Sequence, residues 1–399
     1  MSLSKFFKWL VLLGLPIIMW RCYWYVGFNQ EISNLLCFLI TLIVFLFVGK
    51  DIARKKKKGY DKYVSGIILL FLFSLMMSYV YWGQSPMLTY RAGVGTLSLL
   101  YYYILQRFRV NSKELFRIVL ILAIIYIVLW LYAINKAPEV VFGNLDEVQD
   151  SRGFIRILQL PSIDIVCVLY FVFLVRSSYR KKKLFWGLMT VGCFVVIFLS
   201  LSRMLIFSVL IVSILYIFRN NLKIAFIISL FFVFGYEKIF QNVIVENMIE
   251  MTETQINEEE ESNLRLVEYN HIFTAYPFHV GTMLFGNGVP HVNSEYGKYN
   301  EKLKMDLGFH QSDAGYVGIY ANYGVAMLFL LGLLLVRAIF KKIPNQLQPY
   351  RLFIVSLFIL NLTSYSFWNF GISFAIALYA LNMIEYNNKI VQKKKYERH

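Results

Sequence analysis

Residues 307–324 read LGFHQSDAGYVGIYANYG, and this stretch contains the transition that decides the fold. The polar residues 310–313 are followed directly by an apolar run that continues to about residue 336. A helix needs about 20 apolar residues to cross a bilayer. The stretch therefore predicts a membrane-spanning helix with an imidazole and a carboxylate directly before its first turn.

The rest of the 399-residue chain repeats this pattern. Of its residues, 58% are hydrophobic and 18% are aromatic, which exceeds the usual content of soluble domains. The apolar runs predict an all-α polytopic membrane protein with about twelve transmembrane helices. The predicted spans are 6–22, 32–49, 63–82, 87–106, 114–134, 161–177, 184–200, 203–218, 223–240, 315–336, 351–367 and 369–385.

The distribution of charge predicts the orientation of these spans. The chain has 40 lysines and arginines, 24 acidic residues and a net charge of +16. With both termini in the cytoplasm, 29 of the basic residues but only 5 of the acidic residues fall on the cytoplasmic side. This split follows the positive-inside rule. The positive charge is thus explained by membrane topology, and we expect no nucleic-acid partner.

The spans and loops divide the chain into three parts. Residues 1–240 hold nine spans and an outer loop at about 135–160. Residues 241–314 form one large outer loop with short helices, and a loop of this length is usually functional or has its own structure. Residues 315–399 hold three spans and a basic cytoplasmic tail. Cysteines at the spans are expected to be core residues without a disulfide: Cys22, Cys37, Cys167 and Cys193.

Arginines on the outer side depart from the positive-inside rule. Arg203 lies between two apolar runs in SLSRML, where a charge is costly unless it is paired or faces water. It either extends to the interface from a helix end or binds an anion such as phosphate through its two-pronged guanidinium. Arg265 lies in a predicted helix that Ser262 caps, where it either binds substrate or pairs with Glu261 or Glu268.

Three further outer arginines are candidates for substrate contacts. Arg152 and Arg156 are four residues apart, so they face one way on a helix or are ordinary loop charges. Arg91 and Asp164 lie a few residues inside their spans, where they either pair with each other or line a cavity.

The histidines of the long loop do not indicate a metal site. The spacing of His271, His279 and His291 relative to His310 matches no metal-binding signature. We therefore expect no metal.

The large outer loop also has an ordered pattern. It runs NLRLVEYNHIFTAYP, then FGNG, then HQSDAGY at the start of a span, with SRGFIRI and LSLSR upstream. This order resembles the bacterial O-antigen polymerase family (Wzy-type oligosaccharide repeat-unit polymerases) and the related O-antigen ligase family. The resemblance covers the whole topology, and the order of Arg203, Arg265, FGNG and His310 carries it.

The resemblance implies a membrane glycosyltransferase that acts at the periplasmic face of the bacterial inner membrane. Its donor would be a glycan on undecaprenyl diphosphate and its acceptor a lipid-linked repeat unit, with a chain-length regulator and a flippase as partners. The resemblance links Arg203 and Arg265 to activity. Ligases have a functional histidine, often followed by Asn, at the position of His310. Here Gln311 follows, so His310 and Asp313 both remain candidates for the base.

The chemistry of this reaction suits these residue types. A diphosphate leaving group needs charge stabilisation more than protonation, and arginines supply it, so no metal or other cofactor is expected. A sugar hydroxyl is a poor nucleophile, and His310 or Asp313 is placed to act as its base. The glycines of FGNG and DAGYVG are expected to permit turns and close packing. The predicted substrate contacts are Arg91, Arg152, Arg156, Tyr316 and Tyr320, although tyrosines are also common at membrane boundaries.

Other functions remain open from the sequence. An O-antigen ligase, which moves the finished glycan to a lipid core, would show nearly the same residues. A flippase or transporter is a different class, and the large outer loop and the few charges within spans disfavour it. A metal-dependent lipid-sugar transferase would have acidic residues in the first outer loop, which offers only Glu31.

Overall fold

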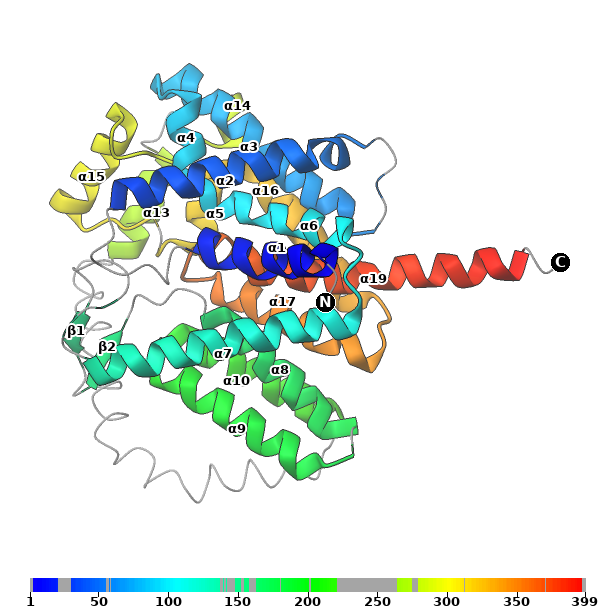
Figure 1. Ribbon diagram of the computed structural model, residues 1–399. Coiled ribbons are helices and arrows are strands. Elements are labelled where there is room, and N and C mark those ends of the chain that lie inside the picture. The colour runs from blue at the N-terminus through cyan, green and yellow to red at the C-terminus, as the bar shows by residue number, and fades with distance from the viewer. Residues whose placement is uncertain are drawn as a thin grey trace.

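The chain folds into a bundle of helices (Figure 1). The computed structural model describes residues 3–20, 30–54, 57, 59–136, 139, 141, 148–151, 154–157, 163–179, 181–200, 202–220, 264–274, 279–311, 313–369 and 371–396. The strand pair among these residues is an antiparallel ribbon of β1 (Val148–Ser151) and β2 (Phe154–Ile157). The predicted span 223–240 and Cys22 lie outside the described residues.

Within the described residues, four helical segments are long and apolar enough to cross a membrane. They are Leu35–Ile52 within α2 (Gln30–Ile52), α3 (Asp61–Trp82), α7 (Ser112–Lys136) and α16 (Gly315–Phe340). Shorter apolar helices accompany them, namely α9 (Lys183–Leu199) and Gly371–Met383 within α19 (Gly371–Tyr396). Large apolar side chains remain exposed on these helices, including Leu46 at 71% and Phe329 at 68%. A lipid environment suits such surfaces, and these features are those of a helical membrane protein.

The helices run back and forth between two ends of the bundle. We call the end that holds the start of α1 (Leu3–Trp20) and the end of α19 the inner end. We call the opposite end, which holds the ribbon and two loop helices, α13 (Leu264–Thr274) and α15 (Glu295–Leu307), the outer end (Figure 1). Further long helices among the described residues are α8 (Ile163–Tyr179), α10 (Arg203–Asn220) and α17 (Gln348–Leu360).

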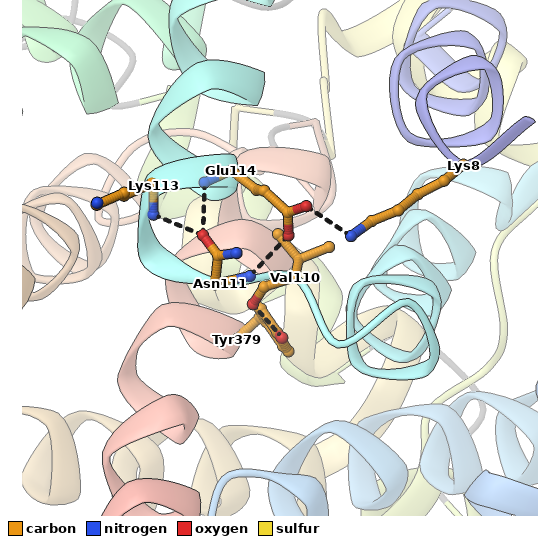
Figure 2. A network of polar contacts seen from close by, with 6 residues as sticks. All are labelled: Lys8, Val110, Asn111, Lys113, Glu114 and Tyr379. Carbon is orange, nitrogen blue, oxygen red and sulfur yellow. Dashed lines mark hydrogen bonds and ion pairs between the residues drawn. The ribbon is translucent and has the colours of Figure 1, made fainter. Parts of the chain in front are cut away.

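Polar contacts join three helices at the inner end (Figure 2). Asn111 Oδ1 accepts hydrogen bonds from the amides of Lys113 and Glu114, both at 3.0 Å, and so caps the start of α7. Glu114 accepts in return from the Asn111 amide and lies 2.7 Å from Lys8 Nζ of α1. Tyr379 of α19 donates to the carbonyl just before Asn111 at 2.7 Å. A cap of this kind contributes about 1 kcal/mol, and here it also ties α1 and α19 to α7.

Among the predicted spans that the structure describes, three are interrupted in their outer halves. The span predicted at 87–106 consists of α4 (Pro86–Ala92), α5 (Val94–Leu97), η1 (Ser98–Leu100) and α6 (Tyr101–Arg107). The span predicted at 351–367 stops at Leu360, before the short α18 (Ser366–Asn369). In α16, Gly324 has a non-helical backbone with φ 74° and ψ 177°. The prediction of continuous helices was wrong at these points. In two of the three spans a glycine lets another backbone segment approach closely: a Cβ atom would lie 3.1 Å from the Trp368 carbonyl oxygen at Gly95 and 2.3 Å from the Leu284 carbonyl carbon at Gly324.

Residues 279–291, which we call the inserted hairpin, fold back along α3. The hairpin begins with α14 (Val280–Phe285). Its His279 ring stacks on Tyr81 with centroids 4.4 Å apart, and its Phe285 ring stacks on Phe73 at 4.9 Å. These two α3 residues are separated by about 12 Å along the helix axis. The hairpin therefore descends beside a membrane-spanning helix before it returns to the outer end.

The inserted hairpin donates hydrogen bonds to backbone carbonyls that the break in α16 leaves without helical partners. The non-helical Gly324 deprives the carbonyls of Ala321 and Asn322 of their usual helical donors. The amides of Asn287 and Gly288 donate to these carbonyls at 2.9 and 3.0 Å, and Asn287 Nδ2 also donates to Ala321 O at 3.1 Å. Backbone polar groups at membrane depth need partners inside the protein. The FGNG turn and the broken helix therefore depend on each other.

Two glycines make this contact close enough. A Cβ atom on Gly286 would lie 2.2 Å from the Asn322 carbonyl carbon, and one on Gly324 would lie 2.3 Å from the Leu284 carbonyl carbon. Both glycines have positive φ, 78° and 74°. In DAGYVG, Gly315 is similar, with φ 54° and a Cβ position 2.4 Å from the Asn361 carbonyl oxygen. The prediction that these glycines permit turns and close packing is confirmed.

Alanine at Gly324 or Gly286 should destabilise the protein strongly. A non-glycine residue with this backbone conformation costs roughly 1–3 kcal/mol before the clash with the facing backbone is counted. Gly332→Ala in the same helix is the matched control, because no described atom from outside its own helical turn lies within 4 Å of its Cβ position. Thermal unfolding of the purified protein in detergent measures the difference. Equal midpoints for G324A and G332A would contradict the described contact.

Candidate functional site

Most of the predicted site residues that the structure describes lie at the outer ends of their helices, and Arg91 lies in the last turn of the short α4. Those at the outer ends are Arg203 as the first residue of α10, His310 and Asp313 between α15 and α16, and Tyr316 and Tyr320 in the first turns of α16. Arg152 lies outside the described residues, as do the side chains of Arg156 in β2 and Arg265 in α13.

His310 and Asp313 lie on one tight turn at the start of α16. The Asp313 amide donates to the His310 carbonyl at 2.8 Å, and Gly308, with φ 70°, ends α15 just before the turn. Gln311 Nε2 donates to Asn300 Oδ1 at 2.8 Å and so fixes the turn to α15. The side chains of His310 and Asp313 are exposed. The turn thus holds an exposed imidazole and an exposed carboxylate at the outer end of the bundle.

The two predicted tyrosines make contacts within the protein. Tyr316 Oη donates to the Phe358 carbonyl at 2.8 Å and joins the start of α16 to the outer end of α17. The Tyr320 ring packs against Phe273 of α13 with centroids 5.2 Å apart. Both side chains are half-buried. These contacts favour a structural role for the two tyrosines.

Arg91 lies close to His291, a histidine whose spacing in the sequence matches no metal-binding signature. Burial, and then the charge of Arg91, lowers the pKa of the His291 imidazole. The His291 amide donates to Gln84 Oε1 at 3.0 Å, and its Nδ1 accepts from the Asn293 amide at 3.1 Å. Because Nδ1 is an acceptor, the neutral ring carries its proton on Nε2. Arg91 and His291 thus provide neighbouring N–H donors where the inserted hairpin returns to the outer end.

Asp164 is not paired with Arg91. It is fully buried in the first turn of α8 and faces Ser373 of α19. Among the described residues, neither oxygen of its carboxyl group has a hydrogen-bond partner. The ion pair considered for Arg91 and Asp164 is therefore wrong. Arg203 is half-buried at the start of α10, a helix that packs along α17.

An aromatic cluster fixes the loop helices to the end of α3. The Trp82 ring stacks on Tyr296 of α15 with centroids 4.2 Å apart, and its Nε1 donates to Asn287 Oδ1 at 3.1 Å. His271 Nε2 of α13 lies 3.0 Å from Tyr299 Oη of α15. Burial lowers the pKa of His271. These contacts give α13, the inserted hairpin and α15 fixed positions over the outer end.

Comparison with known proteins identifies no family for this chain. No family model matches the sequence, and no curated protein matches it. Within the described part of the chain, no three His, Cys, Asp or Glu side chains gather as a metal site.

Acidification should destabilise the outer loop. Burial lowers the pKa of His271 and of His291, so the unfolded chain takes up protons more readily than the folded chain. The stability from these neutral imidazoles is complete above the unfolded pKa of about 6.5, and it is lost as the pH falls below that value. We expect the thermal midpoint to fall from about pH 7 to about pH 5, and to fall less in a His271→Gln, His291→Gln variant.

His310→Gln is the matched control for this experiment, because the imidazole that it removes is exposed. Its midpoint should depend on pH as the wild-type midpoint does. The same pH dependence in the double variant as in the wild type would contradict the roles given to His271 and His291.

Proposed function

We propose that this chain is a glycosyltransferase of the bacterial inner membrane. It polymerises undecaprenyl-diphosphate-linked oligosaccharide repeat units into O-antigen or a similar surface polysaccharide. The observation that carries the proposal is the outer end of α16. There the turn with the exposed His310 and Asp313 side chains precedes α16, which is interrupted at Gly324. The inserted hairpin, which hydrogen-bonds to the interrupted part of α16, places His291 beside Arg91. Such a boundary suits a substrate whose tail lies in lipid and whose sugars lie in water.

In this proposal the outer end is periplasmic and the chain has twelve spans with both termini in the cytoplasm. Basic side chains at the inner ends of the helices support this orientation. Arg107 at the end of α6 lies 2.8 Å from Asp51, and Arg176 near the end of α8 lies over the Phe116 ring at 3.7 Å. The membrane partners are the lipid-linked donor and acceptor, a flippase that supplies them and a chain-length regulator.

The proposed reaction joins an acceptor hydroxyl to the first sugar of the donor glycan. His310 or Asp313 takes the hydroxyl proton, and the hydroxyl oxygen forms a bond to the anomeric carbon of the donor. The bond from that carbon to the diphosphate oxygen breaks, and undecaprenyl diphosphate leaves with the electron pair. Arg203 and Arg265 stabilise the charge that develops on the diphosphate, and this electrostatic role does not require a metal.

Loss of these side chains should abolish long glycan chains without preventing membrane insertion. Removing one electrostatic stabiliser typically costs about 10²–10³ in rate, and removing a general base about 10²–10⁴. We expect Arg203→Ala, Arg265→Ala and His310→Ala each to lose the polysaccharide ladder on a gel when they complement a host from which the gene is deleted. Asp313→Ala tests which residue of the turn is the base.

Lys302→Ala is the matched control, because it removes an exposed cation from α15. It should restore the ladder as the wild type does. The deletion itself separates the alternatives. A remaining band of single repeats indicates a polymerase, lipid-linked long chains indicate a ligase, and unpolymerised precursor held in the cytoplasm indicates a flippase. Full activity in the Arg203, Arg265 and His310 variants would overturn the mechanism.

A further inference from the structure

Asp164 is a carboxyl group that is buried without a cationic partner among the described residues. It lies in the first turn of α8 with 0% of its surface exposed, and neither of its oxygens has a hydrogen-bond partner in the described part of the chain. Ser373 of α19 faces it, is also 0% exposed, and has a hydroxyl without a described partner. Buried polar groups are nearly always satisfied, so two unsatisfied groups side by side need a physical explanation.

The described groups around Asp164 offer little compensation for a negative charge. The thiol of Cys167, one turn further along α8, interacts with the carboxyl group, and Cys193 of α9 interacts with Cys167. The amides of Asp164 itself and of Ile165 also face the carboxyl group, because they begin the helix. The favourable effect of a helix N-terminus on an anion is smaller than the penalty for burying an unpaired ion. The neutral form is therefore the stable one at this position.

We propose that Asp164 and Ser373 form a buried proton-binding site that links the outer ends of α8 and α19. A carboxylic acid and a hydroxyl can satisfy each other, because the acid O–H donates to the serine oxygen while the serine O–H donates to the acid carbonyl. A metal ion suits the site less well. Calcium takes about 6–8 oxygen ligands, whereas these two side chains offer three oxygens between them.

This site has a consequence for the packing of the two helices. Loss of the proton would leave an unpaired charge between α8 and α19, and that charge is stable only if water or a cation reaches it. Ionisation thus requires the outer ends of the two helices to separate or to hydrate. The inference concerns the fold and does not depend on the glycosyltransferase proposal.

Infrared spectroscopy of the full-length protein in detergent tests the proposal. At about pH 7 the wild type should show a carbonyl band of a protonated carboxylic acid that is absent from Asp164→Asn. Asp306→Asn, which removes an exposed carboxylate from α15, is the matched control and should retain the band. Ser373→Ala should shift the band, because it removes the hydrogen-bonding partner of the acid.

One further variant, Asp164→Glu, together with Ser373→Ala keeps the test decisive if Asp164→Asn does not fold. Asp164→Glu should keep a protonated-acid band at a shifted frequency, and Ser373→Ala should still move the wild-type band. The absence of any such band from the wild type, or a band unchanged in Asp164→Asn, would overturn the proposal. A band that neither Asp164→Glu nor Ser373→Ala changes would also overturn it, because the acid would then lie elsewhere.

Discussion

The carbonyl oxygens of Ala321 and Asn322 need hydrogen-bond donors, and the structure of the outer half depends on how they obtain them. A helix that stays continuous across a bilayer satisfies its own backbone, but one that breaks at Gly324 does not. The amides of the FGNG turn supply the missing donors. To donate these hydrogen bonds, the inserted hairpin must pack beside α3. Because α13 precedes the hairpin and α15 follows it in the chain, both helices are then held at the outer end. The His310 and Asp313 turn then follows from the position of α15.

The interruptions of three helices meet in the outer half of the bundle. The Tyr323 hydroxyl, next to the break in α16, lies 2.6 Å from Thr96 Oγ1 in α5. Asn322 Nδ2 donates to Tyr365 Oη, in the connection between α17 and α18, at 3.2 Å. Each irregular segment therefore provides polar partners for another. The inner half is more regular, and its polar contacts cap and connect helices instead of replacing their internal hydrogen bonds.

Much of the helical fold follows from the sequence, because a run of apolar residues is a local signal. The span predicted at 114–134 corresponds to α7, and the span predicted at 63–82 corresponds to α3. The breaks were not predicted. A glycine within an apolar run, such as Gly93 or Gly324, also occurs in continuous helices, and only the segment that packs against it decides the outcome.

The residues of the candidate site were less predictable, because their contacts join distant parts of the chain. His291 has no local signature, and its one signal is that it follows FGNG, where the hairpin must return. Its proximity to Arg91 arises only when the hairpin packs beside α3 and α4. For Asp164 the sequence predicted a contact that the structure does not have. Its position inside a span suggested a cationic partner, whereas in the structure its carboxyl group faces Ser373.

The contact between Gly286 and Gly324 restricts how this architecture can change through evolution. Most tight contacts adapt when one side chain shrinks as its neighbour grows. Here neither residue has a side chain to shorten, and each approaches backbone atoms of the other segment. No compensating substitution on the facing surfaces restores the spacing. We therefore expect the two glycines to be conserved together. Homologous proteins should either keep both or lack both the hairpin and the break in the helix.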